Sequence, residues 1–322
     1  MAMINEIRNT VLAVINKNNY GYLSPQDFNL YAQQAQLDIF EDYFYQYNQF
    51  INKENVRQSG TGYADIVKGL VEVIDSFSEE VFLTQVNENT FNLPADYYLI
   101  NKIFYYPTLL VSGTTQIGNL PKKLDSNGTP FIVAGGFNIP QFPPTNSIVV
   151  NTDSTTLGQA FVTAVDSTNV LSISNTIFNV ALGGENYSIY DNTNITEVER
   201  VSQNKIFYLT SSTLTAPSNQ YPAYVLGGNV ITVYPTSIRQ AGQIKTQYVR
   251  YPKAPNWTYS QLSGGEPLFN QSLSGYQDFE LPDSDRNGLI ARICQYVGIE
   301  IREKDVYQFG TQEDLQETQT QQ

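Results

Sequence analysis

The sequence predicts an α+β protein. A helical base, made of N-terminal helices plus one C-terminal helix, would support a β-rich middle region that carries an inserted all-β subdomain. Three observations predict this class. Apolar residues recur at helical spacing over about the first 80 residues and again near residue 290. From about residue 90, short runs of aromatic and β-branched residues alternate with turn residues.

The composition excludes several classes of protein. Of the 322 residues, 41% are hydrophobic, which is enough for a sizeable core. The formal net charge of -13 argues against a protein that grips nucleic acid through its phosphates, because such proteins present basic surfaces. The single cysteine, Cys294, excludes a disulfide framework within the chain, and the lack of histidine removes histidine-based catalytic triads.

The same composition leads to an expectation about location. No apolar run reaches the roughly 18 residues of a membrane-spanning helix, so we expect no membrane partner. Residues 1–19 lack a positively charged start, and polar residues interrupt their apolar ones. We interpret them as a short amphipathic helix and not as a signal peptide. Synthesis and retention on the cytosolic side of the membrane are therefore expected.

Three helices are predicted in the N-terminal region, at about residues 3–16, 24–52 and 63–77. The second is the best marked. Ser24 suits the N-cap, Pro25 suits the first helical position, and Asp27 lies in the first turn, where the helix dipole favours an acid.

The helix at 24–52 carries more apolar surface than one partner needs. One apolar line runs through Leu30, Leu37, Phe40, Phe44, Tyr47 and Ile51. A second runs through Ala32, Ala35, Ile39, Tyr43 and Phe50. We predict that one face packs on the chain's own Ile66, Leu70, Ile74 and the helix at 289–297. We predict that the tyrosine-bearing side meets a neighbouring subunit, because Tyr is enriched at interfaces. The predicted interface residues are Phe40, Tyr43, Phe44, Tyr47 and Phe50.

Strands are predicted in the middle of the chain. Residues 90–107 give a turn followed by a strand, 222–235 a hairpin that turns at Gly227 and Gly228, and 243–252 a further strand. Residues 196–210 are interpreted as a short helix running into a strand. Within 108–196, short runs at roughly ten-residue spacing indicate a small sandwich or barrel; they lie at 147–152, 160–165, 170–175 and 186–191.

A C-terminal helix is predicted from about residue 281 to 298, capped by Asp283 or Ser284. The predicted domain organisation has five parts: a helical region at 1–89, a β-rich region at 90–107 and 197–255, the inserted subdomain at 108–196, a C-terminal loop and helix at 256–310 that pack on the N-terminal helices, and a polar tail at 311–322.

The chemical motifs are weak. Residues 283–288 match the start of a calcium loop, D-x-D-x-N-G, but the twelfth position, which needs a bidentate Glu, is Cys294. Glu79 with Glu80 and Glu197 with Glu199 could be drawn as acid–base pairs, but adjacency in sequence does not establish that geometry. No glycine-rich segment has phosphate-loop spacing. We therefore predict no catalytic residue, no metal site and no cofactor.

Several blocks of the sequence resemble structural proteins of tailed bacteriophages. The blocks are AQQAQLDIFEDYF (32–44), NLPADYY (92–98), PAYVLGGNVITVYP (222–235), YVRYPKAPNW (248–257) and LPDSDRNGLIARICQYVGIEIRE (281–303). They are most similar to head-to-tail connector ring proteins of crAss-like podoviruses, and more distantly to the adaptors called tail tubular protein A. The resemblance covers about 1–107 and 197–310. We interpret 108–195 as a lineage-specific insertion.

The resemblance implies a virion structural protein and not an enzyme. It implies a homo-oligomeric ring, commonly a dodecamer, docked beneath the portal protein and next to other ring or tail proteins. DNA would pass through the lumen without sequence-specific binding, and the helical blocks would pack between subunits over about 2,000 Å² or more. The protein would be made in the bacterial host cytoplasm and would lie at the head–tail junction of the virion.

Two other functions are compatible with the sequence. The first is a tail-associated protein that binds carbohydrate or a receptor through the aromatic, Asn-rich insertion at 108–196. The second is a glycosidase that uses two carboxylates. Loss of adsorption on deletion of the insertion would favour the first, and hydrolysis on a glycan panel would favour the second.

Overall fold

The protein has the predicted α+β class. The computed structural model describes residues 3–15, 23–56, 64–115, 122–126, 145–153, 158–167, 169–179, 184–300, 308 and 311. Its residues divide into two compact units. Unit 1 consists of Met1–Phe77 and Tyr251–Gln322, and unit 2 consists of Ser78–Arg250. A helical base and a β-rich middle region are therefore both present, as predicted.

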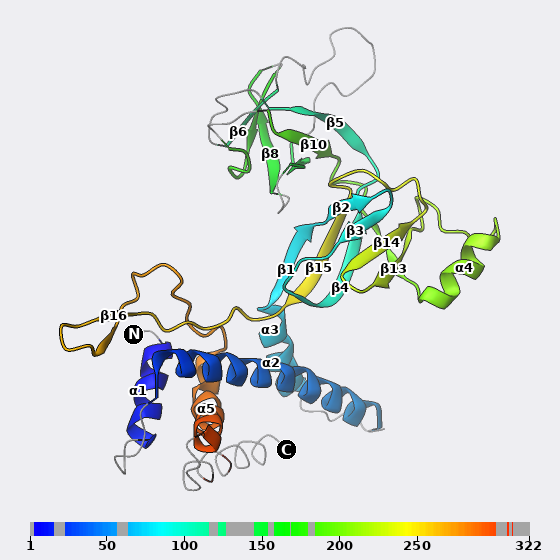
Figure 1. The fold of residues 1–322 in the computed structure, drawn as a ribbon. Coiled ribbons are helices and arrows are strands. Elements are labelled where there is room, and N and C mark those ends of the chain that lie inside the picture. Colours follow the sequence, from blue (N-terminus) through cyan, green and yellow to red (C-terminus); the bar gives the residue numbers. More distant parts are fainter. Residues whose placement is uncertain are drawn as a thin grey trace. The chain divides into compact units, whose positions relative to one another are not determined.

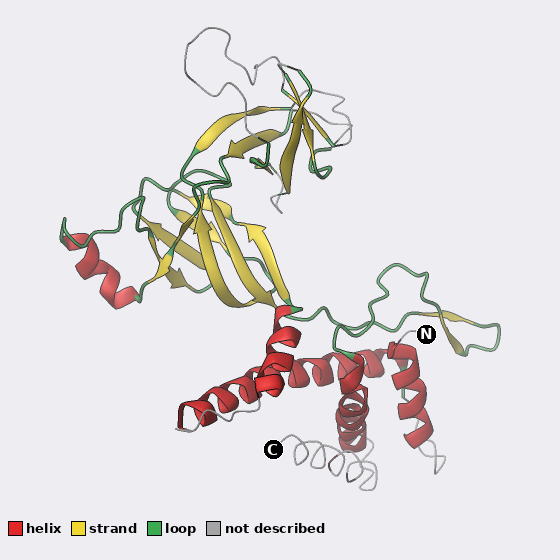
Figure 2. Cartoon of the chain, turned by 180° about the vertical axis from the view of Figure 1, so that it is seen from behind, coloured by secondary structure: helices red, strands yellow, loops and turns green. Residues whose placement is uncertain are grey.

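Unit 1 is built around the long helix α2, Pro25–Val56. The C-terminal helix α5, Arg286–Glu300, packs against α2 and also against α1, Met3–Ile15 (Figures 1 and 2). The helix α3, Ala64–Asp75, packs against α2. The predicted start of α2 is confirmed, because the Ser24 hydroxyl accepts a hydrogen bond from the Asp27 backbone N–H at 3.1 Å.

A small hairpin lies in the segment that leads from unit 2 to α5. Its strands are β16, Tyr259–Gln261, and β17, Pro267–Phe269. Trp257 stacks on Tyr259 and on Phe269, with ring centroids 5.6 Å and 5.9 Å apart. The sequence predicted a loop for this segment, and that prediction was wrong. These strands are only three residues long, too short for an alternating pattern to stand out, and the aromatic stack supports them.

Unit 2 contains two sheets that share one core. The four-stranded sheet has the order β1 (Ser78–Phe82), β15 (Ile244–Arg250), β4 (Tyr97–Tyr105), β11 (Thr196–Glu197). The five-stranded sheet has the order β12 (Glu199–Arg200), β13 (Ala223–Gly227), β14 (Val230–Tyr234), β3 (Thr90–Asn92), β2 (Thr84–Asn87). Ile103, Tyr105, Ile231 and Val233 lie in the shared core. Val198, between β11 and β12, joins them as the chain passes from one sheet to the other.

The predicted insertion forms a six-stranded antiparallel sheet of its own. Its strand order is β5 (Leu109–Thr114), β10 (Asn186–Tyr190), β7 (Ile148–Asn151), β8 (Gln159–Val165), β9 (Val170–Ile173), β6 (Lys123–Asp125). Val149, Val162, Leu171 and Tyr187 are among its core residues. A second cluster joins this sheet to the rest of unit 2 and contains Phe82, Tyr106, Ile148, Val150 and Tyr190.

The hairpin at 222–235 is confirmed. Strands β13 and β14 pair in register, with Gly227 opposite Val230. The turn residues are Gly228 and Asn229, one step later than predicted, and Gly228 adopts a φ of +67°. Glycine suits this position because a left-handed backbone costs it little.

Two predicted boundaries are wrong. The helical region does not extend to residue 89, because β1 and β2 occupy 78–87. Two adjacent glutamates obscure β1 in the sequence, yet each carboxylate is paired with a cation of the neighbouring strand: Glu79 with Arg250 at 2.7 Å, and Glu80 with Lys245. The order at 196–210 is also reversed: strands β11 and β12 come first, and the helix α4, Gln203–Ser211, follows.

Candidate interaction surfaces

The buried face of α2 is lined by small and aromatic residues. Phe28, Ala32, Ala35, Ile39, Phe40 and Tyr43 are all buried within unit 1. Gln36 is also buried, with both ends of its amide bonded. Its Nε2 donates to the Lys253 carbonyl at 2.8 Å, and its Oε1 accepts from the Glu280 backbone N–H at 3.1 Å. This polar anchoring explains how an amide sits in an otherwise apolar face.

The structure places two of the five predicted interface residues inside the chain's own core. Phe40 is fully buried and makes edge-on contacts with Phe44 and Phe77, with ring centroids 5.1 Å and 5.2 Å apart. The Tyr43 hydroxyl donates to the carboxylate of Asp285, which immediately precedes α5. Because these side chains are already covered within unit 1, neither is free to form the centre of a contact between copies.

The other predicted interface residues differ in their exposure. Phe44 and Tyr47 are half-buried, and the side chain of Phe50 lies outside the described residues. The side chain of Ile66, predicted to face α2, is likewise not described. Among the described side chains of α2, the large apolar ones that are exposed are Leu30 and Tyr45, at 62% and 64%. Periodicity identified two apolar lines, but the buried side takes residues from both: Phe40 belongs to the first, and Ala32, Ala35, Ile39 and Tyr43 belong to the second.

A polar seam joins α2 to α5. Arg292 on α5 pairs with Asp42, and its guanidinium lies 4.0 Å from Asp38. The Tyr296 hydroxyl donates to Asp38, and the Tyr296 ring stacks on Tyr31 with centroids 6.1 Å apart. Burial, together with the Asp38 carboxylate, raises the pKa of Tyr296 to about 12. The tyrosine is therefore neutral at physiological pH and donates its proton to the carboxylate.

Asn29 fixes the chain segment that follows unit 2. Its side-chain oxygen accepts from the Trp257 backbone N–H, and its Nδ2 donates to Asn256 Oδ1, both at 2.8 Å. The indole of Trp257 in turn donates to Asn5 on α1 at 3.0 Å, and the Arg8 guanidinium lies 3.9 Å from the centre of its ring. Trp257 is thus held from both α1 and α2.

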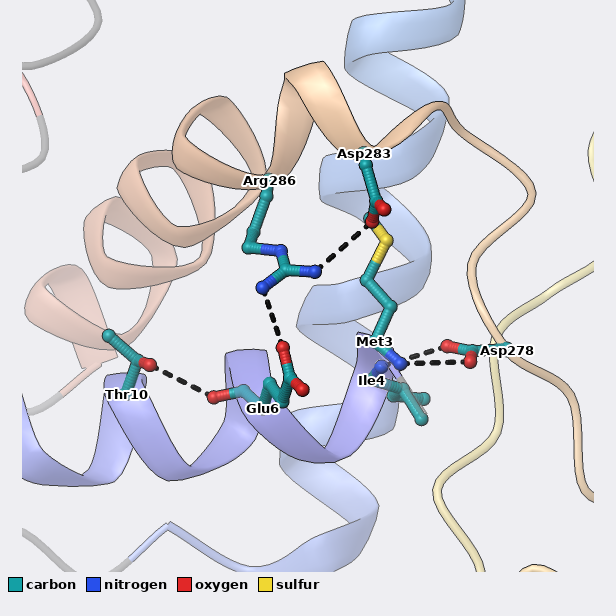
Figure 3. A network of polar contacts seen from close by, with 7 residues as sticks. All are labelled: Met3, Ile4, Glu6, Thr10, Asp278, Asp283 and Arg286. Carbon is teal, nitrogen blue, oxygen red and sulfur yellow. Dashed lines mark hydrogen bonds and ion pairs between the residues drawn. The ribbon is translucent and has the colours of Figure 1, made fainter. Parts of the chain in front are cut away.

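Asp278 caps α1 from a distant part of the chain. Its two carboxylate oxygens accept the backbone N–H groups of Met3 and Ile4 at 3.0 Å and 2.8 Å, as Figure 3 shows. Arg286 lies close by and bridges Glu6 on α1, at 2.6 Å, to Asp283, at 3.1 Å. A carboxylate at a helix N-terminus satisfies unpaired N–H groups and interacts favourably with the helix dipole.

The calcium-like segment is used for packing. Asp283 binds Arg286, and Asp285 accepts the hydroxyl hydrogen of Tyr43, so the two carboxylates have separate partners. Asp283–Asp285 form a 3₁₀ turn that leads into α5. Within the part of the chain that the structure describes, no group of three or more acidic or cysteine side chains is arranged to hold a metal ion.

Unit 2 has an open cleft of about 610 Å³ between β1 and the turn at 92–96. Glu79, Glu80 and Asp96 give it an acidic lining. The first two are paired with cations, and Asp96 accepts the Tyr248 hydroxyl at 3.2 Å. Burial, with the nearby Asp96 and Glu79 carboxylates, raises the pKa of Tyr248. The paired state of these acids gives no support for a general acid and base here.

Sequence reasoning did not single out the surface around α4. Figures 1 and 2 show this helix at the margin of unit 2, beside β13. Only Ile206 of the helix is buried, whereas Phe207, Tyr208, Leu214 and Tyr221 are between 70% and 94% exposed. We call these four residues the α4 surface. The sequence does show a run of large apolar residues here that does not follow helical spacing, and this pattern could have indicated the exposed surface.

No protein-family model matches the chain, and a search of curated proteins returns no similar sequence. None of the described helices combines the length and apolar character that crossing a bilayer requires.

Proposed function

We propose that the protein is a virion structural subunit of a ring in the head-to-tail connector of a tailed bacteriophage, below the portal and around the passing DNA. The observation that carries the proposal is the pairing of the resembling blocks within unit 1. The block at 32–44 contributes Gln36, whose side-chain amide donates to the backbone carbonyl of Lys253 in the block at 248–257. The same block contributes Tyr43, which binds Asp285 of the block at 281–303.

Three segments that lie far apart in the sequence thus form one helical base through specific side-chain bonds. The insertion, which the resemblance does not cover, has its own sheet and its own core. A connector subunit needs a rigid base and further surface for its neighbours. The exposed apolar residues of α2 and of the α4 surface supply surface of this kind.

The proposal is tested in virus particles and in solution. Mass spectrometry of purified virions should detect the chain at a copy number that corresponds to one ring. The purified protein should form rings by itself or when mixed with its portal protein. A protein that stays monomeric in both conditions and is absent from purified virions would refute the proposal.

A second candidate function follows from the separate core of the insertion. Residues 108–196 could bind a carbohydrate or a receptor as an added module, as the strands β5 to β10 form a sheet apart from the two that share the main core. Particles that lack this segment would then assemble and fail to adsorb to the host. Normal adsorption by such particles would exclude this role.

A further inference from the structure

The α4 surface leaves large apolar side chains on and around a short helix exposed to solvent. α4 has nine residues, and helices of this length are marginal in water without a packed face. Its anchor is the buried Ile206, while Phe207 and Tyr208 contact each other edge-on at 5.9 Å and point away from the core. Exposed aromatic side chains with large contact area are typical of the centre of a protein interface.

Two cations lie at the start of α4, although the formal net charge of the chain is -13. Arg200 and Lys205, which flank the start of α4, are both exposed. Within the described residues neither cation has a carboxylate partner. The surface is therefore apolar with a basic rim, and its complement is apolar with an acidic rim.

The outer face of α2 has this complementary chemistry. Leu30, Leu37, Glu41 and Tyr45 are spaced seven, four and four residues apart, which places them on one side of the helix. Leu30 and Tyr45 are large apolar residues that are exposed on the described part of α2, and Glu41 is exposed between them. Among the described residues Glu41 has no ion pair, so its carboxylate is available to a cation from outside the chain.

We propose that the α4 surface of one copy docks on the outer face of α2 of a second copy. Phe207 and Tyr208 form the apolar centre of this contact, and Lys205 pairs with Glu41 at its rim. Each copy then offers two different surfaces, so the contact is head-to-tail and propagates to a ring or a filament. This inference rests on the proposed function, because it identifies the subunit contact of the ring.

A cysteine-pair experiment tests the contact. The natural Cys294 is buried, and burial raises the pKa of its thiol to about 12, so it stays unreactive during mild oxidation. A chain with Tyr45→Cys and Tyr208→Cys should form a ladder of disulfide-linked oligomers. Mixing two chains that each carry one of these changes should give linked dimers and nothing larger. The control pairs Tyr45→Cys with Leu268→Cys, at another exposed leucine, and should form no ladder.

The outcomes separate this contact from its alternatives. Absence of a ladder at concentrations up to the millimolar range overturns the proposal. A linked but monomeric double-cysteine chain also overturns it, because the two surfaces would then meet within one copy. If the wild type forms rings in virions and the ladder is absent, only this contact is refuted, and the proposed function stands.

Charge reversal provides a second test. Lys205→Glu alone and Glu41→Lys alone should each weaken self-association by about tenfold, because each places like charges at the rim. The chain that carries both changes should recover most of the lost affinity. Phe207→Ala with Tyr208→Ala should weaken association by about 30-fold or more, as expected for central aromatic residues. Sedimentation velocity measures all four variants, and equal association by all of them refutes the contact.

Discussion

Asp278 ties the first turn of α1 to the segment that leads into α5, and its removal should destabilise unit 1. The carboxylate accepts two N–H groups of the first turn of α1, at 3.0 Å and 2.8 Å, and also the backbone N–H of Phe279 at 2.9 Å. An N-cap contributes about 1 kcal/mol, and a hydrogen bond to a charged group contributes roughly 1.5–3 kcal/mol. We expect Asp278→Ala to cost about 2–3 kcal/mol in the free energy of unfolding of unit 1.

The single tryptophan makes this measurement specific to unit 1. Trp257 is buried there and bonded to Asn5 on α1, so its fluorescence should report unfolding of this unit in urea. Asp278→Asn keeps one oxygen acceptor and should lose only about 1 kcal/mol, because the charge and one bond are removed.

Asp283→Ala is the matched control. The Asp283 side chain is 80% exposed, and its one ion-pair partner among the described residues is Arg286, three residues further along the chain. Its loss should change the free energy of unfolding by less than about 0.5 kcal/mol. If Asp278→Ala also stays within about 0.5 kcal/mol of the wild type, the capping argument is refuted.

Three further predictions concern packing, charge and pH. Gly242→Ala should destabilise unit 2 by about 1–3 kcal/mol in thermal unfolding, because φ is +77° and an added Cβ would lie 3.2 Å from Val150. At Gly228, φ is +67° but an added Cβ would meet open space, so Gly228→Ala should show only the cost of the left-handed backbone. Arg292→Ala should cost about 1–2 kcal/mol in urea unfolding, because Asp38 and Asp42 lose their shared counter-charge, and Arg292→Lys should cost less. The pKa of Tyr296 is raised to about 12 in the folded protein, so its contribution to stability is complete below about pH 10 and is lost as the pH rises to about 12. Tyr296→Phe should therefore make the stability of unit 1 less sensitive to pH in this range. If the variant has the same alkaline unfolding curve as the wild type, the assignment is contradicted.

Local patterns in the sequence were sufficient for several elements. The α+β class followed from the change in the spacing of apolar residues along the chain. Residues on one face recur about every 3.6 positions in a helix and every two positions in a strand. The start of α2 followed from Ser24, Pro25 and Asp27, since capping acts within one turn. The hairpin of β13 and β14 followed from its paired glycines. Each of these signals depends on neighbours in the chain.

Other features required contacts between distant residues. The two glutamates of β1 disfavour a strand until Arg250 and Lys245 of β15 neutralise them. Asp278 gave no signal in the sequence, because the N–H groups that it caps lie about 275 residues away. Gln36 and Tyr43 help to set which side of α2 is buried, and their partners belong to the C-terminal part of the chain.

The sequence by itself determined the α+β class, the start of α2 and the hairpin of β13 and β14, and it showed more apolar surface on α2 than one partner needs. Only the tertiary structure decided which side of α2 is covered, with Ala32, Ile39 and Phe40 turned inward and Leu30 and Tyr45 left exposed. The physical reason is that periodicity measures how apolar a face is. Burial depends on which distant polar and aromatic groups can meet that face and satisfy its hydrogen bonds.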